Sequence, residues 1–128
     1  MDNAVDEFLR FDSPAQFTGR RPNSDETING MEIKKGVQLI CILGAGNRDP
    51  EKFDNPDVLD IERKKIIPLS FGGGIHHCVG AGLGKLEAKI AIKTLLEKFS
   101  RIELKNKEYH FHDSLHSRGL EDLELKVS

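Results

Sequence analysis

The sequence predicts an α+β fold, and three observations support that prediction. Apolar residues recur at helical spacing over residues 1–11 and again over residues 81–99. Short strand-like runs lie between these two helices and after the second. Residues 44–70 contain many turn-forming residues and few long apolar runs, which indicates an irregular meander. A chain of 128 residues is long enough for one modest core, so we expect a single, fragment-like domain over 1–128.

The N-terminal part is predicted to form a helix, a strand, a hairpin and a second strand. The apolar face of the helix is formed by Ala4, Val5, Phe8 and Leu9, and Pro14 lies beyond its end. A strand is predicted over 17–21, and Asn29-Gly30 predicts a hairpin between two short strands. Residues 37–43 are almost continuously apolar. They predict a well-buried strand, with Cys41 as an inert core residue.

The C-terminal part contains the longest predicted helix, over residues 81–99. Its apolar stripe is formed by Leu83, Leu86, Ile90 and Phe99, joined by Leu95 and Leu96. At about 1.5 Å per residue, the helix would be roughly 28 Å long. Residues 123–127 alternate apolar and charged side chains, which predicts an edge strand.

The composition argues against several classes of function. A net charge of −2 gives no reason to expect nucleic acid or an anionic membrane as partner. No stretch is long and apolar enough for a membrane span, and Met1-Asp2-Asn3 does not resemble a signal peptide. The two cysteines have no paired spacing, so no disulfide framework is predicted. We therefore expect a cytoplasmic protein without a membrane or nucleic-acid partner.

The residues with the clearest chemistry lie in the loop 71–80, Phe-Gly-Gly-Gly-Ile-His-His-Cys-Val-Gly. Its glycines, Gly72 among them, allow backbone angles closed to other residues and a close approach to a flat ligand. Backbone N–H groups and the N-terminus of the next helix would stabilise a Cys78 thiolate. A phosphate loop is excluded because no Gly-Lys-Ser/Thr follows. Zinc is disfavoured because His76, His77 and Cys78 are adjacent, which leaves a buried structural cysteine as the alternative.

The loop 71–80 resembles, position by position, the cysteine-ligand loop of the cytochrome P-450 family. The resemblance covers about the last third of that family, in its soluble bacterial or archaeal type. It implies the C-terminal proximal part of the fold, with a short helix, a small sheet, a meander, the ligand loop, a long helix and terminal strands. It also implies haem b as cofactor, with Cys78 as axial ligand of the iron and Phe71, Gly72 and Gly80 around it. A thiolate ligand favours O–O cleavage.

Glu7 and Arg10 lie three residues apart on the first helix, so their side chains emerge on one face. By itself such a pair is usually an exposed ion pair of small effect. With the ligand loop downstream, it resembles the family's Glu-x-x-Arg, which fixes the meander behind the haem. Val58 stands where the family often has a third basic partner. Either Arg63 substitutes for that partner or the network is only a pair.

Two further runs extend the resemblance. Asn47-Arg48-Asp49-Pro50 is similar to the Ala-Asn-Arg-Asp-Pro run of soluble members. We expect this run to have a structural role, as a turn with a capping Asp. Leu86-Glu87-Ala88 looks like the family's Leu-Glu-Ala.

The resemblance also assigns residues to the haem propionates, which need cationic or N–H partners. His76 lies two residues before Cys78, where the family places Arg or His for one propionate. Arg20 matches the arginine that reaches the other propionate. The alternative is that Arg20 is a solvated surface residue, and the neighbouring Arg21 is a second candidate for the same role. His77 is expected to face outward.

Partners and substrate follow only from the resemblance. The electron donor would be a ferredoxin or a flavoprotein. Lys85 and Lys89 are expected on the exposed side of their helix, where they either steer an acidic donor or are simply solvated. A small hydrophobic substrate would meet the segments 15–17 and 114–116. His110, His112 and His116 have no further ligands at metal spacing, so an ordinary hairpin is favoured there.

The sequence contains no Gly-x-Asp/Glu-Thr-like run, the acid–alcohol pair with which the family activates oxygen. Two functions stay open. One is the haem-binding C-terminal portion of a monooxygenase, whose full-length form hydroxylates substrates with O₂. The other is a non-catalytic haem-binding or remnant module that keeps only the proximal fold. We assign no catalytic residue and expect the isolated chain to be inactive. We further expect either that the chain forms an oligomer or that an N-terminal portion is missing.

Overall fold

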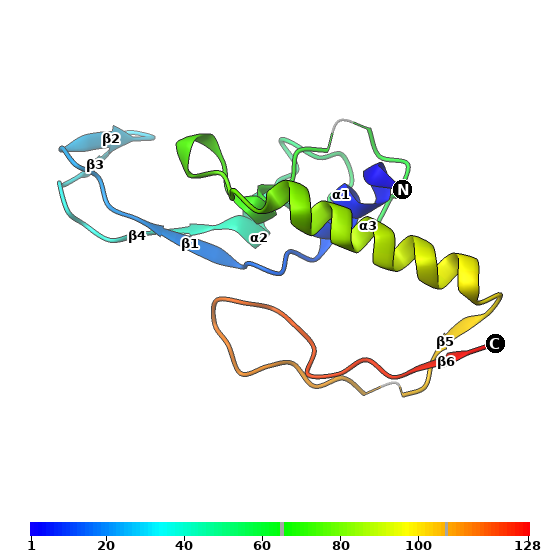
Figure 1. Ribbon diagram of the computed structural model, residues 1–128. Helices are drawn as coiled ribbons and strands as arrows, with labels where there is room; N and C mark the ends of the chain where they lie inside the picture. Colours follow the sequence, from blue (N-terminus) through cyan, green and yellow to red (C-terminus); the bar gives the residue numbers. More distant parts are fainter. Residues whose placement is uncertain (65, 107) are drawn as a thin grey trace.

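The computed structural model describes residues 1–64, 66–106 and 108–128 (Figure 1). Its elements in chain order are α1 (Asp2–Phe11), β1 (Phe17–Arg20), β2 (Glu26–Ile28), β3 (Met31–Ile33), β4 (Leu39–Ile42), α2 (Leu43–Gly46), the 3₁₀ turns η1 (Leu69–Phe71) and η2 (Gly74–His76), α3 (Ala81–Lys98), β5 (Ile102–Leu104) and β6 (Leu125–Val127). Helices combined with small antiparallel sheets confirm the predicted α+β class.

The strands of the described segments form three separate antiparallel pairs, β1–β4, β2–β3 and β5–β6. The hairpin predicted at Asn29-Gly30 is confirmed, since these residues have φ of 49° and 80° and join β2 to β3. β6 is shorter than predicted and pairs with β5 in the register Ile102↔Val127. β5 has no counterpart among the predicted strands.

The prediction of a well-buried strand over 37–43 is wrong. Among the described strands β4 pairs with β1 alone, so the two-stranded sheet leaves most of β4 exposed, including Ile40 and Ile42. Cys41 is exposed as well, and therefore it is not a core residue. The apolar run turns inward only at Leu43, which begins α2 and is buried.

The interior is more polar than apolar. Among the described residues, the buried apolar side chains are Val5, Leu43 and Ala81, and the buried polar ones are Glu7, Arg10, Ser13, Asn47 and Ser70. On α1 the buried side consists of Val5, Glu7 and Arg10, whereas Phe8, expected on the packed face, is 37% exposed. The hydrogen bonds that join α1, the end of α2 and η1, together with the buried ion pair within α1, therefore supply contacts that apolar packing provides in a larger core.

The predicted helix over 81–99 is confirmed as α3, with Phe99 as its C-cap. Its sides are arranged differently from the prediction. Lys85 and Lys89 are paired with Asp6 and Asp2 of α1, at 2.6 and 2.7 Å, and are not free on an exposed face. Instead the apolar residues Leu83, Leu86 and Ile90 are exposed. α3 thus lies beside α1 (Figure 1) and is joined to it by these ion pairs, and its predicted apolar stripe is left exposed.

No helix in the described segments has both the length and the apolar character needed to cross a membrane.

Candidate functional site

The loop that contains Cys78 is closed by backbone hydrogen bonds. Gly72 and Gly74 have φ of 70° and 61°, in the left-handed region that side chains disfavour. The N–H of Cys78 donates to the carbonyl of Phe71 at 2.9 Å, and the carbonyl of Cys78 accepts from Ala81 at 3.2 Å. The cysteine therefore lies at the point where the loop enters α3.

Cys78 lines a cavity of about 390 Å³ that α1, β1, η1 and the loop form together. Its apolar walls are Leu9, Phe17, Leu43 and Phe71. Arg20, His76 and Gly72 line the same cavity. The structure therefore brings together predicted site residues from β1 and from the loop 71–80. Gly80 lies beside the thiol, where an added Cβ would be 3.7 Å from Sγ.

The two candidate arginines on β1 are placed differently. Arg20 donates through Nη1 to the Thr18 hydroxyl at 2.9 Å and lines the cavity. Arg21 donates instead to the Gln38 side chain at 2.9 Å. His77 is exposed, as expected, with its ring against the edge of Phe71 at 6.5 Å between centroids.

Among the substrate-contact candidates, Ala15, Phe17 and His116 line this cavity. The rings of Phe17 and His116 meet edge to face with centroids 5.4 Å apart. Leu115 is 91% exposed. In the described segments, His, Cys, Asp and Glu side chains do not form a cluster of three that could bind a metal ion.

Behind the loop, Glu7 and Arg10 form a fully buried ion pair. All five N–H donors of the Arg10 guanidinium have acceptors. Nε and Nη2 donate to the Glu7 carboxylate, and Nη1 and Nη2 donate to the carbonyls of Asn47, Pro56 and Val58 at 2.9, 2.8 and 3.1 Å. The pair therefore fastens the meander to α1.

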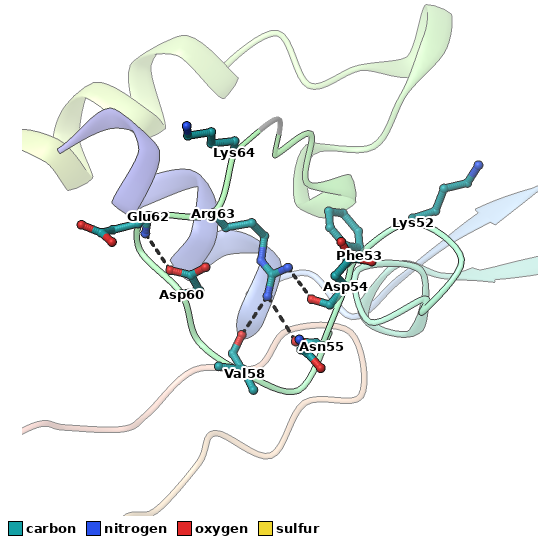
Figure 2. Close-up of a pocket in the computed structure, with 9 residues that line it drawn as sticks. All are labelled: Lys52, Phe53, Asp54, Asn55, Val58, Asp60, Glu62, Arg63 and Lys64. Carbon is teal, nitrogen blue, oxygen red and sulfur yellow. Dashed lines mark hydrogen bonds between the residues drawn. The ribbon is translucent and has the colours of Figure 1, made fainter.

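Arg63 is the third member of this network. Its Nε lies 3.3 Å from the Glu7 carboxylate, and its other nitrogens donate to the carbonyls of Asp54, Asn55 and Val58 (Figure 2). Arg63 also lines an open meander cavity of about 610 Å³. The backbone carbonyl of Val58 accepts hydrogen bonds from both arginines. The basic side chain that reaches Glu7 is that of Arg63, five residues after Val58.

A family model described as Cytochrome P450 matches residues 1–121. The chain belongs to the cytochrome P450 family. Among its relatives, the biotin biosynthesis cytochrome P450 of Bacillus subtilis is 46% identical over 120 residues, which are 94% of this chain and 30% of that protein. The pulcherriminic acid synthase of the same organism is 38% identical over 126 residues, 91% of this chain and 31% of the relative.

The structure is also similar to solved P450 structures. One, a P450 in complex with an acyl carrier protein ligated to hexadec-9Z-enoic acid, has a TM-score of 0.96 and 43% identity over 99% of this chain and 33% of its own. Another, a P450 from Bacillus megaterium in complex with testosterone, has a TM-score of 0.93 and 32% identity over 98% of this chain and 35% of its own. The chain spans about a third of the length of these proteins.

The site of this P450 chain has the groups that a haem requires. One soft sulfur donor, Cys78, lines a cavity with apolar walls, and Arg20 and His76 of the same cavity are suited to bind carboxylates. Left-handed glycines and the bare Gly80 leave room for a flat ring beside the sulfur. These residues therefore fit the family's cofactor.

The carboxyl group of Glu7 has a strongly lowered pKa. Burial alone would raise this pKa, but hydrogen bonds from the Arg10 side chain, the Asp60 N–H and the Arg63 side chain outweigh burial. Together they lower the pKa of Glu7 from its ordinary 4.5 to about 2. Glu7 is thus charged at every physiological pH, as its two arginine partners require.

Sequence reasoning missed two buried residues of this region. Asn47 was expected to serve in a turn and Ser70 had no role, yet both are buried between α1 and the ligand loop. For Asn47 the signal was present in the Asn-Arg-Asp-Pro run, whereas nothing in the sequence distinguishes Ser70 from a surface serine.

Proposed function

We propose that this chain is the haem-binding C-terminal portion of a cytochrome P450 monooxygenase, with Cys78 as the thiolate ligand of haem b. The cavity that gathers Cys78, His76 and Arg20 between apolar walls is the observation that most supports this proposal. The membership of the family and the fit of the donor set agree with it.

Each residue has a distinct task in this proposal. The loop's backbone N–H groups and the N-terminus of α3 stabilise the negative charge on Cys78. Arg20 and His76 would bind the propionates, and Phe71, Gly72 and Gly80 would hold the ring. When bound, the haem supplies the O₂-dependent chemistry that inserts oxygen into a substrate C–H bond.

The electron donor is proposed to be a ferredoxin or a flavoprotein, and the substrate a small hydrophobic molecule that Ala15, Phe17 and His116 contact. Because Lys85 and Lys89 are engaged by Asp6 and Asp2, an acidic donor would have to compete with these intramolecular pairs. Similarity to a P450 solved with a fatty acyl chain on its carrier protein makes such a chain the first substrate to test. We propose the cytoplasm as the location.

The second candidate is a non-catalytic haem-binding module. It is favoured by one observation, the lack of an acid–threonine run in the sequence. Both candidates need the same thiolate ligand, so both should give the same absorption spectrum with haem. They differ in whether the protein turns over a substrate.

The spectrum of the haem-loaded chain, reduced and treated with carbon monoxide, tests the proposal. A thiolate ligand gives a strongly red-shifted Soret band. Cys78→Ala should abolish that band, whereas Cys41→Ala, which removes the other exposed thiol, should preserve it. Equal effects of the two substitutions, or no red-shifted band in the unmodified chain, would contradict the assignment.

A further inference from the structure

Asn47 is fully buried at the C-terminal end of α2, so the polar atoms of its side chain need partners within the protein. Its Oδ1 accepts the backbone N–H of Leu69 at 2.7 Å, and its Nδ2 donates to the hydroxyl of Ser70 at 3.1 Å. Both partners belong to η1, the turn that leads into the ligand loop. The amide side chain therefore binds η1 at two adjacent points.

The same residue is bound to α1. Its backbone carbonyl accepts from Nη1 of Arg10 at 2.9 Å, and the Ser70 hydroxyl donates to the carbonyl of Leu9 at 2.6 Å. Asn47 and Ser70 thus form a buried bridge between the end of α1 and η1. Packing is close here as well, because a Cβ added at Gly46 would lie 2.7 Å from Cδ1 of Leu69.

From η1 the connection continues directly to the cysteine. Phe71 is the last residue of η1, and its carbonyl accepts the N–H of Cys78 at 2.9 Å. Any displacement of η1 would move this carbonyl, and with it the backbone of Cys78. A chain of hydrogen bonds therefore runs from the Arg10 guanidinium through Asn47 and η1 to the ligand loop.

We propose that Asn47 is a positioning residue that fixes η1, and through it Cys78, relative to the buried Glu7–Arg10 pair. Ser70 is its partner in this task. The proposal concerns the folded chain itself, and only its consequence for haem ligation rests on the proposed function. A residue that merely contributed to stability would affect all segments alike, so local measurements distinguish the two roles.

Amide hydrogen exchange of the haem-free chain is the first test, on Asn47→Ala and Ser70→Ala. We expect the hydrogen-bonded amides within residues 69–78 to exchange at least roughly tenfold faster, because each substitution removes two buried side-chain hydrogen bonds. Amides of β5 and β6, which the bridge does not touch, should keep their rates. The matched control is Ser13→Ala, since Ser13 is buried and donates to the carbonyl of Ala15 at 2.8 Å, outside the bridge.

Uniformly faster exchange, unchanged exchange over 69–78, or the same local effect from Ser13→Ala would overturn the proposal. If Asn47→Ala does not fold, Ser70→Ala decides, because it removes a single hydroxyl. The haem-loaded chain gives a second test. The share of the red-shifted carbonyl band should fall in Asn47→Ala and Ser70→Ala and persist in Ser13→Ala.

The two tests separate the positioning role from the proposed function. A chain with no red-shifted band would refute haem–thiolate binding, while the exchange rates would still decide whether Asn47 positions the loop. Conversely, a normal band in Asn47→Ala together with unchanged loop exchange would refute the positioning role alone.

Discussion

The guanidinium of Arg10 meets the carboxylate of Glu7 at two points, Nε to Oε2 at 2.7 Å and Nη2 to Oε1 at 2.8 Å, with neither side chain exposed to solvent. Two-point contacts of this kind combine charge with a fixed orientation. Since small domains have a total stability of about 5–15 kcal/mol, the cost of removing one partner of such a buried pair, about 3–5 kcal/mol, is a substantial fraction of it.

Arg10→Ala should lower the free energy of unfolding by about 3–5 kcal/mol, because it leaves the Glu7 charge buried without its main partner. Denaturant titration of the two proteins measures the difference. As a control, Lys93→Ala removes an exposed pair with Glu97 at 3.5 Å and should cost less than about 0.5 kcal/mol. Equal unfolding midpoints for Arg10→Ala and the unmodified chain would show that the pair contributes no more than a surface bridge.

Acid should destabilise the protein partly through Glu7. Its pKa in the folded state, about 2, lies below its ordinary value of 4.5, so the stabilisation is complete above pH 4.5 and is lost as the pH falls towards 2. The full contribution at neutral pH is roughly 3 kcal/mol. In Glu7→Gln this part of the pH dependence should disappear, as measured by urea unfolding between pH 7 and pH 2. An identical slope in both proteins would contradict the prediction.

Arg63→Ala should loosen the meander selectively. The side chain holds the Glu7 carboxylate and three backbone carbonyls, and its loss should cost about 1–3 kcal/mol. Limited proteolysis should then cleave within residues 54–63 before other segments. Val58→Ala, in the same loop but with an exposed side chain, serves as control and should leave the cleavage pattern unchanged.

The exposed apolar side of α3 should cause the isolated chain to self-associate. Leu83, Leu86 and Ile90 are 62%, 51% and 55% exposed along one side of the helix. The double variant Leu86→Lys/Ile90→Lys should shift the mass measured by light scattering towards the monomer without lowering the melting temperature. A lysine at the buried Ala81 should instead destabilise the fold. A monomeric unmodified chain would refute the prediction.

The isolated chain, supplied with haem, an electron donor and small hydrophobic substrates, should not form hydroxylated product in proportion to the donor consumed. Without an acid–threonine run, protons are not delivered in an ordered way, so the reduced oxygen should appear as superoxide or peroxide. Product and peroxide are quantified in the same reaction. Stoichiometric product from a monodisperse monomer would show that the chain is a complete enzyme.

Local sequence was enough to predict the elements whose geometry depends on neighbouring residues. Asn29-Gly30 specifies its hairpin because both residues tolerate positive φ. The loop around Cys78 was predictable for the same reason, since left-handed glycines and the start of a helix are local features. The periodicity of α3 predicted its length almost to the residue.

Burial and long-range pairing were decided by the tertiary structure. An apolar run such as 37–43 shows that cover is needed, but not which segment provides it. Within the described part of the chain β1 alone pairs with β4, which leaves Cys41 exposed. The contact of Arg63 with Glu7 spans 56 positions, and that of Asn47 with Ser70 spans 23. Such contacts depend on how the chain folds back on itself. The sequence by itself therefore determined the ligand loop and the local elements, and the packing of distant segments determined what holds that loop in place.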